Sequence, residues 1–181
     1  MSSEPARRAV SNEAHKIAFV DAHYFAGRAR AACVLANAWR DTTPHAEWTV
    51  ELEQVADYRP GHFFERELPC ILAALARAPE AIEVIVVDGY VVLDEHGKPG
   101  LGEHVFRHFS GRIPVVGIAK RSYAGSHFAA HVLRGASQSP LFVTARGIPL
   151  TAAAEHVRLM HGPFRIPTLC TRVDQLCRGL I

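Results

Sequence analysis

The sequence predicts an α/β fold in which three antiparallel strands and then parallel strands form a mixed β-sheet, with helices on both of its faces. Two observations lead to this prediction. Strand-like segments with turn signals between them fill the first third of the chain, and continuous apolar segments then alternate with segments of helical periodicity. A chain of this order builds a mixed sheet between helical layers.

The amino-terminal strands are expected over residues 17–23 and 29–36, as a hairpin that turns at Gly27. A third strand, over residues 47–54, alternates polar and apolar side chains, which is typical of an edge-like strand with one wet face. These segments therefore predict three antiparallel strands.

The middle of the chain alternates helix and buried strand. A helix is expected over residues 63–78, where apolar residues recur at helical spacing, and Pro79 ends it. Residues 82–87 and 113–118 are continuous apolar, β-branched runs, typical of strands covered on both faces. The remaining segments are a glycine-rich loop at 97–102, helices at 103–109, 128–133, 151–160 and 169–178, and a strand at 141–144. This is the order of a ribonuclease-H-like fold, although composition alone also allows other α/β sandwiches.

Length and composition are those of an ordinary globular chain. The 181 residues suit one domain, expected over residues 15–181, after a polar, disordered lead-in over residues 1–14. The chain is 49% hydrophobic, and its net charge of +2 is too small to indicate nucleic-acid binding by itself. The apolar runs are too short to span a membrane, and the first residues lack the apolar region of a signal peptide. We therefore expect a cytoplasmic protein.

Several common kinds of site have no motif in the sequence. The four cysteines show no Cys-x-x-Cys spacing and stand among apolar residues, which favours buried thiols. His127 and His131 are four residues apart, but a solvated helix face explains this pattern better than a zinc site. Neither a Gly-x-Ser-x-Gly nucleophile motif nor a Walker-type phosphate loop occurs.

Three acidic residues stand where an α/β fold builds ligand sites. Asp88 ends the apolar run 82–87, and ligands gather at the carboxyl ends of strands in open α/β sheets. Asp21 lies within the first strand. Glu67 interrupts the apolar stripe of the first helix, whereas Glu65 lies on its solvated side. Burying a lone carboxylate is costly unless it is paired or ligates a metal.

Each acid also has a purely structural interpretation, in which Asp21 and Glu67 pair with arginines and Asp88 belongs to a turn with Gly89. The three acids together favour a hard divalent cation, because Mg²⁺ takes oxygen ligands from carboxylates and from substrate phosphates. Lys120, just beyond the next strand, can add positive charge where the negative charge of a phosphate develops. The residues thus predict a metal-dependent phosphodiesterase that uses Mg²⁺, for which Mn²⁺ can substitute.

Six short segments form an ordered set along the chain. They are Val20-Asp21, then Tyr58-Arg59-Pro60-Gly61 with Arg66-Glu67-Leu68-Pro69, Val87-Asp88-Gly89, Gly100-Leu101-Gly102-Glu103-His104, Gly117-Ile118-Ala119-Lys120, and Arg165-Ile166-Pro167 with Thr171-Arg172. With these segments the chain resembles the endonuclease V family, which repairs deaminated bases with a ribonuclease-H-like fold. The resemblance covers nearly the whole chain, from about residue 17 to residue 178.

The resemblance implies an endonuclease that hydrolyses a phosphodiester bond near deaminated purines, such as inosine, in DNA or RNA. In such an enzyme Asp21, Glu67 and Asp88 would bind the metal, and Lys120 would approach the scissile phosphate. DNA, RNA or both would be the partner of a protein that acts as a monomer in DNA repair. The sequence does not distinguish DNA from RNA, because no feature clearly reads a 2′-hydroxyl.

The resemblance also implies a base-binding region. The wedge that holds a duplex open would be formed by Tyr58, Arg59, Pro60 and Gly61. The pocket for an extruded hypoxanthine would be lined by Gly61 together with Gly100, Leu101 and Gly102, with His104 in the same group. Glycines let the backbone come close to a base, and an enzyme that reads one base must first take it out of the stack.

The chain departs from the family pattern at two places. Where the family has a pocket histidine, the sequence places Asp94, and the late acidic or histidine position is best filled by Asp174. These departures affect inosine specificity more than nuclease chemistry. The alternative functions are a nucleic-acid-binding relative of the fold and a structure-directed nuclease without inosine specificity.

Overall fold

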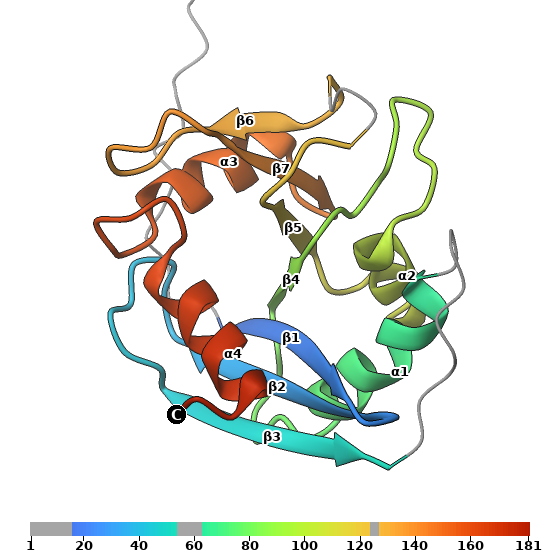
Figure 1. The fold of residues 1–181 in the computed structure, drawn as a ribbon. Coiled ribbons are helices and arrows are strands. Elements are labelled where there is room, and N and C mark those ends of the chain that lie inside the picture. Colours follow the sequence, from blue (N-terminus) through green and yellow to red (C-terminus); the bar gives the residue numbers. More distant parts are fainter. Residues whose placement is uncertain (1–15, 54–62, 124–126) are drawn as a thin grey trace, which may run out of the picture.

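The computed structural model of the protein describes residues 16–53, 63–123 and 127–181. Within these residues a sheet runs in the order β3-β2-β1-β4-β5-β7-β6 (Figure 1). The elements along the chain are β1 (Ile17–Phe25), β2 (Arg28–Ala36), β3 (Ala46–Leu52), α1 (Phe63–Leu75), β4 (Val84–Asp88), α2 (Leu101–His108), β5 (Val115–Ala119), β6 (Ala130–Val132), β7 (Leu141–Arg146), α3 (Leu150–Leu159) and α4 (Thr168–Arg178).

The strand directions confirm the predicted mixed sheet. β1, β2 and β3 are antiparallel, and the turn at Gly27 adopts a φ of 77°, which glycine tolerates without steric cost. β4 lies parallel to β1, and β5 lies parallel to β4. β7 then returns antiparallel to β5 and pairs with β6. The far edge of the sheet is therefore antiparallel as well, which the sequence pattern did not predict.

The two faces of the sheet carry separate helical layers, because alternate residues of a strand point to opposite faces. Ile17, Phe19 and Val86 pack with α3 and α4 on one face. Ala18 and Val20 belong to the core cluster on the other face, together with residues of α1 and α2. Figure 1 shows α1 and α2 on one side of the central strands and α3 and α4 on the other. This arrangement confirms the predicted helices on both faces.

The prediction of a helix over residues 128–133 is wrong, since this segment contains the strand β6. Ala130, His131 and Val132 pair with Val143, Phe142 and Leu141 of β7. A short apolar run fits a buried helix turn and a strand equally well, and here pairing with β7 decides between them. His127 and His131 accordingly do not share a helix face.

The other predicted segments form the expected elements with shifted ends. α1 stops at Leu75, short of the predicted end at 78, and α2 starts at Leu101, inside the predicted glycine-rich loop. The cysteines are free thiols, three of them buried and Cys170 partly so. No helix in the described ranges has the length and apolar character that crossing a membrane requires. The predicted lead-in over residues 1–14 lies outside the described residues.

Candidate functional site

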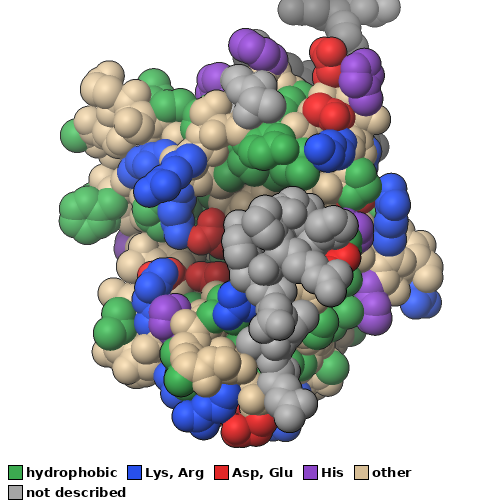
Figure 2. Space-filling view, turned by 45° about the vertical axis from the view of Figure 1, so that its right-hand side comes forward, with side chains coloured by type: hydrophobic (Ala, Val, Ile, Leu, Met, Phe, Trp, Pro, Cys, Tyr) green, Lys and Arg blue, Asp and Glu red, His purple; other side chains and the backbone are tan. Residues whose placement is uncertain are grey.

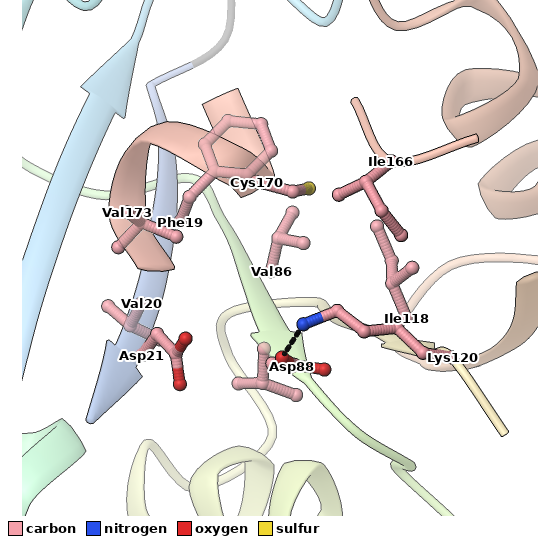
Figure 3. A pocket seen from close by; sticks show the side chains of 11 residues that line it. Phe19, Val20, Asp21, Val86, Asp88, Ile118, Lys120, Ile166, Cys170 and Val173 are labelled. Carbon is pink, nitrogen blue, oxygen red and sulfur yellow. Dashed lines mark hydrogen bonds and ion pairs between the residues drawn. The ribbon is translucent and has the colours of Figure 1, made fainter. Parts of the chain in front are cut away.

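Asp21, Asp88 and Lys120 come together at the carboxyl ends of three neighbouring strands. The register pairs Val20 with Val87, so Asp21 and Asp88 follow on adjacent parallel strands. Lys120 directly follows β5, and its Nζ donates a hydrogen bond to Asp88 Oδ2 at 2.5 Å. Strand alternation turns all three side chains toward the α4 face, where they line one pocket with side chains of that helix (Figure 3).

Glu67 approaches the same acids from the opposite layer. On α1 it is 9% exposed, whereas Glu65 is exposed to solvent, as the helical phase predicted. Glu67 and Asp88 line a second pocket, between α1, α2 and the segment after β4. Asp88 therefore stands at the boundary between the two pockets. Figure 2 shows acidic side chains in a hollow of the surface, with Lys and Arg side chains beside them.

Burial and mutual repulsion strongly perturb two of the acids. Burial, helped by the charge of Asp88, raises the pKa of Asp21 to about 7, although the Ala22 amide donates to Asp21 Oδ1 at 2.8 Å. Burial and the charges of Asp21 and Asp88 raise the pKa of Glu67 to about 8. Burial disfavours the cationic form of Lys120, but the bond to Asp88 and the nearby acids outweigh this and raise its pKa. Such clustered shifts are typical of functional sites.

The donor set fits a hard divalent cation. Asp21 and Glu67 have no arginine ion pair within the described residues, so the structural interpretation of these acids finds no support there. Their oxygens are the ligands that Mg²⁺ and Mn²⁺ prefer, and a cation would relieve the repulsion among them. As the side chains stand, no three His, Cys, Asp or Glu residues in the described ranges already form a metal-binding cluster.

The second pocket has an aromatic wall and lies beside the acids. Gly100, Leu101 and His104 line it, as does Tyr123. The ring of His104 stacks on Phe64 with centroids 3.8 Å apart and planes 8° apart. Burial lowers the pKa of His104, which keeps its imidazole neutral at pH 7. A neutral imidazole offers one donor and one acceptor.

The glycines of this segment serve internal packing. Gly100 N donates to Val91 O at 2.8 Å, and Gly102 N donates to Tyr90 O at 3.1 Å. A Cβ atom would lie 2.5 Å from Tyr90 O at position 100, and 2.7 Å from a methyl of Val91 at position 102. Gly100 and Leu101 border the pocket, whereas Gly102 packs against Val91, away from it.

Three further predicted site regions have different surroundings. Asp94 Oδ1 accepts hydrogen bonds from the amides of His96 and Lys98, and its side chain lines a neighbouring surface pocket, apart from the one that holds His104. Asp174 on α4 pairs with Arg178 at 2.9 Å, and its charge acts on both Asp21 and Lys120. The segment from Tyr58 to Gly61 lies outside the described residues.

Comparison with known proteins decides the family. The family model of endonuclease V matches residues 2–160. The chain belongs to the endonuclease V family. An endonuclease V of Streptomyces avermitilis is 33% identical over 168 residues, which cover 82% of this chain and 71% of that protein. This family is one of endonucleases, which confirms the predicted enzyme class of hydrolases.

Solved structures of the family share the fold. The crystal structure of endonuclease V from Streptomyces avermitilis superposes with a TM-score of 0.75 at 26% identity, covering 93% of this chain and 82% of that one. Endonuclease V of Ciona intestinalis, in complex with a 23mer DNA that contains an inosine followed by a ribo-adenosine, gives a TM-score of 0.78 at 16% identity, covering 93% and 86%. The ribonuclease-H-like fold predicted from the element order is thereby confirmed.

Three residues that line the pocket beside His104 were not among the predicted site residues, namely Tyr90, Lys98 and Tyr123. Tyr90 directly follows Asp88-Gly89, and its hydroxyl donates to Arg121 O at 2.8 Å. Its place directly after Asp88-Gly89, at the carboxyl end of β4, was the signal available in the sequence. Glu103 of α2 is buried and forms ion pairs with Arg107 of the same helix and with Arg146 at the end of β7, so its role is structural.

Proposed function

We propose that this chain is a divalent-metal-dependent endonuclease that hydrolyses a phosphodiester bond near a deaminated purine, such as inosine, in DNA or RNA. The observation that carries the proposal is the convergence of Asp21, Glu67 and Asp88 beside Lys120, next to a pocket with an aromatic wall. The family name and the inosine-containing DNA bound by the Ciona intestinalis protein support the same substrate class.

The acids have separable roles in this proposal. Asp21, Glu67 and Asp88 would hold Mg²⁺ or Mn²⁺, because together they supply oxygen ligands from both helical layers. When bound, such an ion activates water and stabilises the leaving oxygen. Lys120 keeps an ammonium group beside Asp88, where it stabilises negative charge that develops on the phosphate.

The base is read in the pocket beside Glu67. Leu101 and the stacked pair of His104 and Phe64 form walls against which a flat ring fits. The neutral imidazole of His104 can both donate to and accept from a purine edge. Extrusion costs least for a mispaired or damaged base, which favours deaminated purines over normal ones.

We place Tyr58 at the tip of a wedge that holds the duplex open, and this assignment is supported by the sequence alone. Tyr58→Ala should weaken binding to modified duplex by about ten- to a hundredfold, since base–aromatic stacking is worth roughly 1–3 kcal/mol. The loss should be smaller on strands whose base is already unpaired. Arg59→Ala should instead weaken binding to all sequences alike and reduce its salt dependence, as expected for a phosphate contact. If Tyr58→Ala binds and cleaves every substrate as the parent does, this segment is only a turn and not a wedge.

The function is tested with matched strands of DNA and RNA, with and without a single inosine, incubated with Mg²⁺, Mn²⁺ or chelator. We expect cleavage near inosine that requires the metal and is lost in Asp21→Ala and Asp88→Ala. Equal cleavage of all strands would favour the structure-directed nuclease, and binding without cleavage would favour the binding relative. Full activity in chelator would exclude the metal mechanism.

A further inference from the structure

Phe164 is an exposed aromatic residue on the loop before α4. Its side chain is 75% exposed, the largest fraction of any large apolar side chain in the described residues. A single exposed apolar residue needs no explanation by itself. Two further observations, the anchoring of its loop and the contact of that loop with the acid pocket, distinguish Phe164.

A buried arginine, Arg134, holds the backbone of this loop in place. The guanidinium of Arg134, 6% exposed, donates to carbonyl oxygens of Met160, His161, Gly162, Phe164 and Arg165. The bond to Phe164 O measures 3.0 Å. Gly135 allows the close approach of the two segments, because a Cβ there would lie 2.3 Å from Pro163 O. The backbone that carries the phenyl ring is therefore fixed while the ring itself faces water.

The same loop borders the acid pocket. Arg165 donates from Nη2 to Lys120 O at 2.5 Å and to Pro140 O at 2.7 Å, which ties the loop to the residue after β5. Ile166 lines the pocket that holds Asp21 and Asp88 (Figure 3). Phe164 is two residues from Ile166, a chain distance of about 7 Å. Through Ile166 this loop borders the pocket on the α4 side of Asp88, whereas the pocket of His104 lies on the α1 side.

The charge around the loop suits a polyanion. Arg165 directly follows Phe164 in the chain and bonds to the carbonyl oxygen of Lys120, and Arg121, the next residue, is exposed. A positively charged track with an aromatic ring beside it is the arrangement by which proteins hold single strands without reading their sequence.

We infer that Phe164 is a stacking platform for an unpaired base of the nucleic acid, on the opposite side of the scissile phosphate from the extruded purine. This inference rests on the proposed function and adds a second base contact to it. The contact is independent of sequence, because every base offers a flat face. It requires the strand to be unpaired at that position, so the enzyme should prefer single-stranded or frayed flanks.

The test measures binding of the full chain to inosine-containing single strands in Ca²⁺, which takes the same oxygen ligands as Mg²⁺. Phe164→Ala should weaken binding about five- to a hundredfold. This is the loss that corresponds to one base–aromatic stacking contact when each 1.4 kcal/mol changes the affinity about tenfold. Phe164→Trp should retain it. Leu180→Ala is the matched control, since Leu180 is 68% exposed but lies beyond the far end of α4, about 16 Å along the helix.

A scan with single abasic positions identifies the stacked base. If one base stacks on Phe164, removing that base should weaken binding to the parent protein as much as Phe164→Ala weakens binding to the intact strand. The abasic strand should then bind Phe164→Ala no more weakly than it binds the parent. Additive losses at every position, or unchanged binding by Phe164→Ala, would overturn the inference while leaving the proposed function intact. If Phe164→Ala instead abolished self-association and left strand binding unchanged, the ring would be a protein contact. A parent protein that binds no nucleic acid would refute the proposed function itself.

Discussion

Glu65 and Glu67 are chemically identical side chains two residues apart on α1. Glu65 is exposed to solvent, whereas Glu67 is buried. Glu67→Gln keeps the size of the side chain but removes the charge that holds a cation. We expect it to reduce cleavage by at least the ~10–100-fold that loss of an outer-shell partner costs a metal site.

Glu65→Gln is the control for that change, and it should leave cleavage nearly unchanged. Both variants should be compared at saturating Mg²⁺, with circular dichroism to show that α1 persists. Equal losses in the two variants would mean that α1 has a different orientation from the one described.

At the residue scale, the sequence was most informative where a charged residue broke an apolar pattern. The buried position of Glu67 and the strand-end position of Asp88 followed from periodicity. Asp94 is a counter-example, because its carboxylate closes a turn through the amides of His96 and Lys98. Short polar side chains in loops commonly bond the backbone in this way, and no pattern in the sequence tells such a turn from a pocket wall.

At the element scale, the packing of α2 gives a prediction whose sign is not obvious. In a helix, alanine is favoured over glycine by about 1 kcal/mol. At position 102, however, a Cβ would lie 3.0 Å from the backbone Cα of Val91, which cannot swing aside as a side chain does. Overpacking of a core costs about 1–3 kcal/mol, so Gly102→Ala should lower the thermal midpoint and disturb the adjacent pocket.

Thermal unfolding followed by circular dichroism checks this prediction. Thr151→Ala, on the exposed first turn of α3, is the control and should change stability by less than about 0.5 kcal/mol. A stabilised Gly102→Ala would show that α2 moves away from Val91 at little cost.

The elements that the sequence predicted are those with a strong local signal. The covered strands β4 and β5 are continuous apolar runs, and the β1–β2 hairpin has its turn at Gly27. β6 has three residues and no period of its own, so only its pairing with β7 makes it a strand. The antiparallel direction of β7 likewise depends on long-range packing, which local patterns do not encode.

At the scale of the whole molecule, the buried acids make stability depend on pH. The pKa values of Asp21 and Glu67 are raised on folding, to about 7 and about 8, so the folded chain binds protons more tightly than the unfolded chain. Their contribution to the free energy of unfolding is therefore fully present below about pH 4 and is lost as pH rises through 7 and 8. One pKa unit corresponds to about 1.4 kcal/mol, so the loss is on the order of a few kcal/mol for each acid.

Denaturant titrations of the metal-free protein between about pH 5 and about pH 9 measure this loss. Asp21→Asn should flatten the profile and raise stability above neutral pH, whereas Glu65→Gln should leave the profile unchanged. Added Mg²⁺ should stabilise the parent most at high pH, where the acids are charged. A profile that rises with pH in the metal-free protein would contradict the burial of these acids.

The packing of α4 against β1 and β2 also constrains when the protein can fold during synthesis. Arg172 of α4 pairs with Glu47 of β3 at 2.6 Å, although 125 residues separate them in the chain. At about 5–20 residues per second, a ribosome needs about 6–25 s to add those residues. As the first strands emerge from the ribosome during that interval, the helix that covers one of their faces does not yet exist. The apolar face of β1 is then open to chaperones and to other nascent chains, and the acid pocket can close only after translation has passed α4.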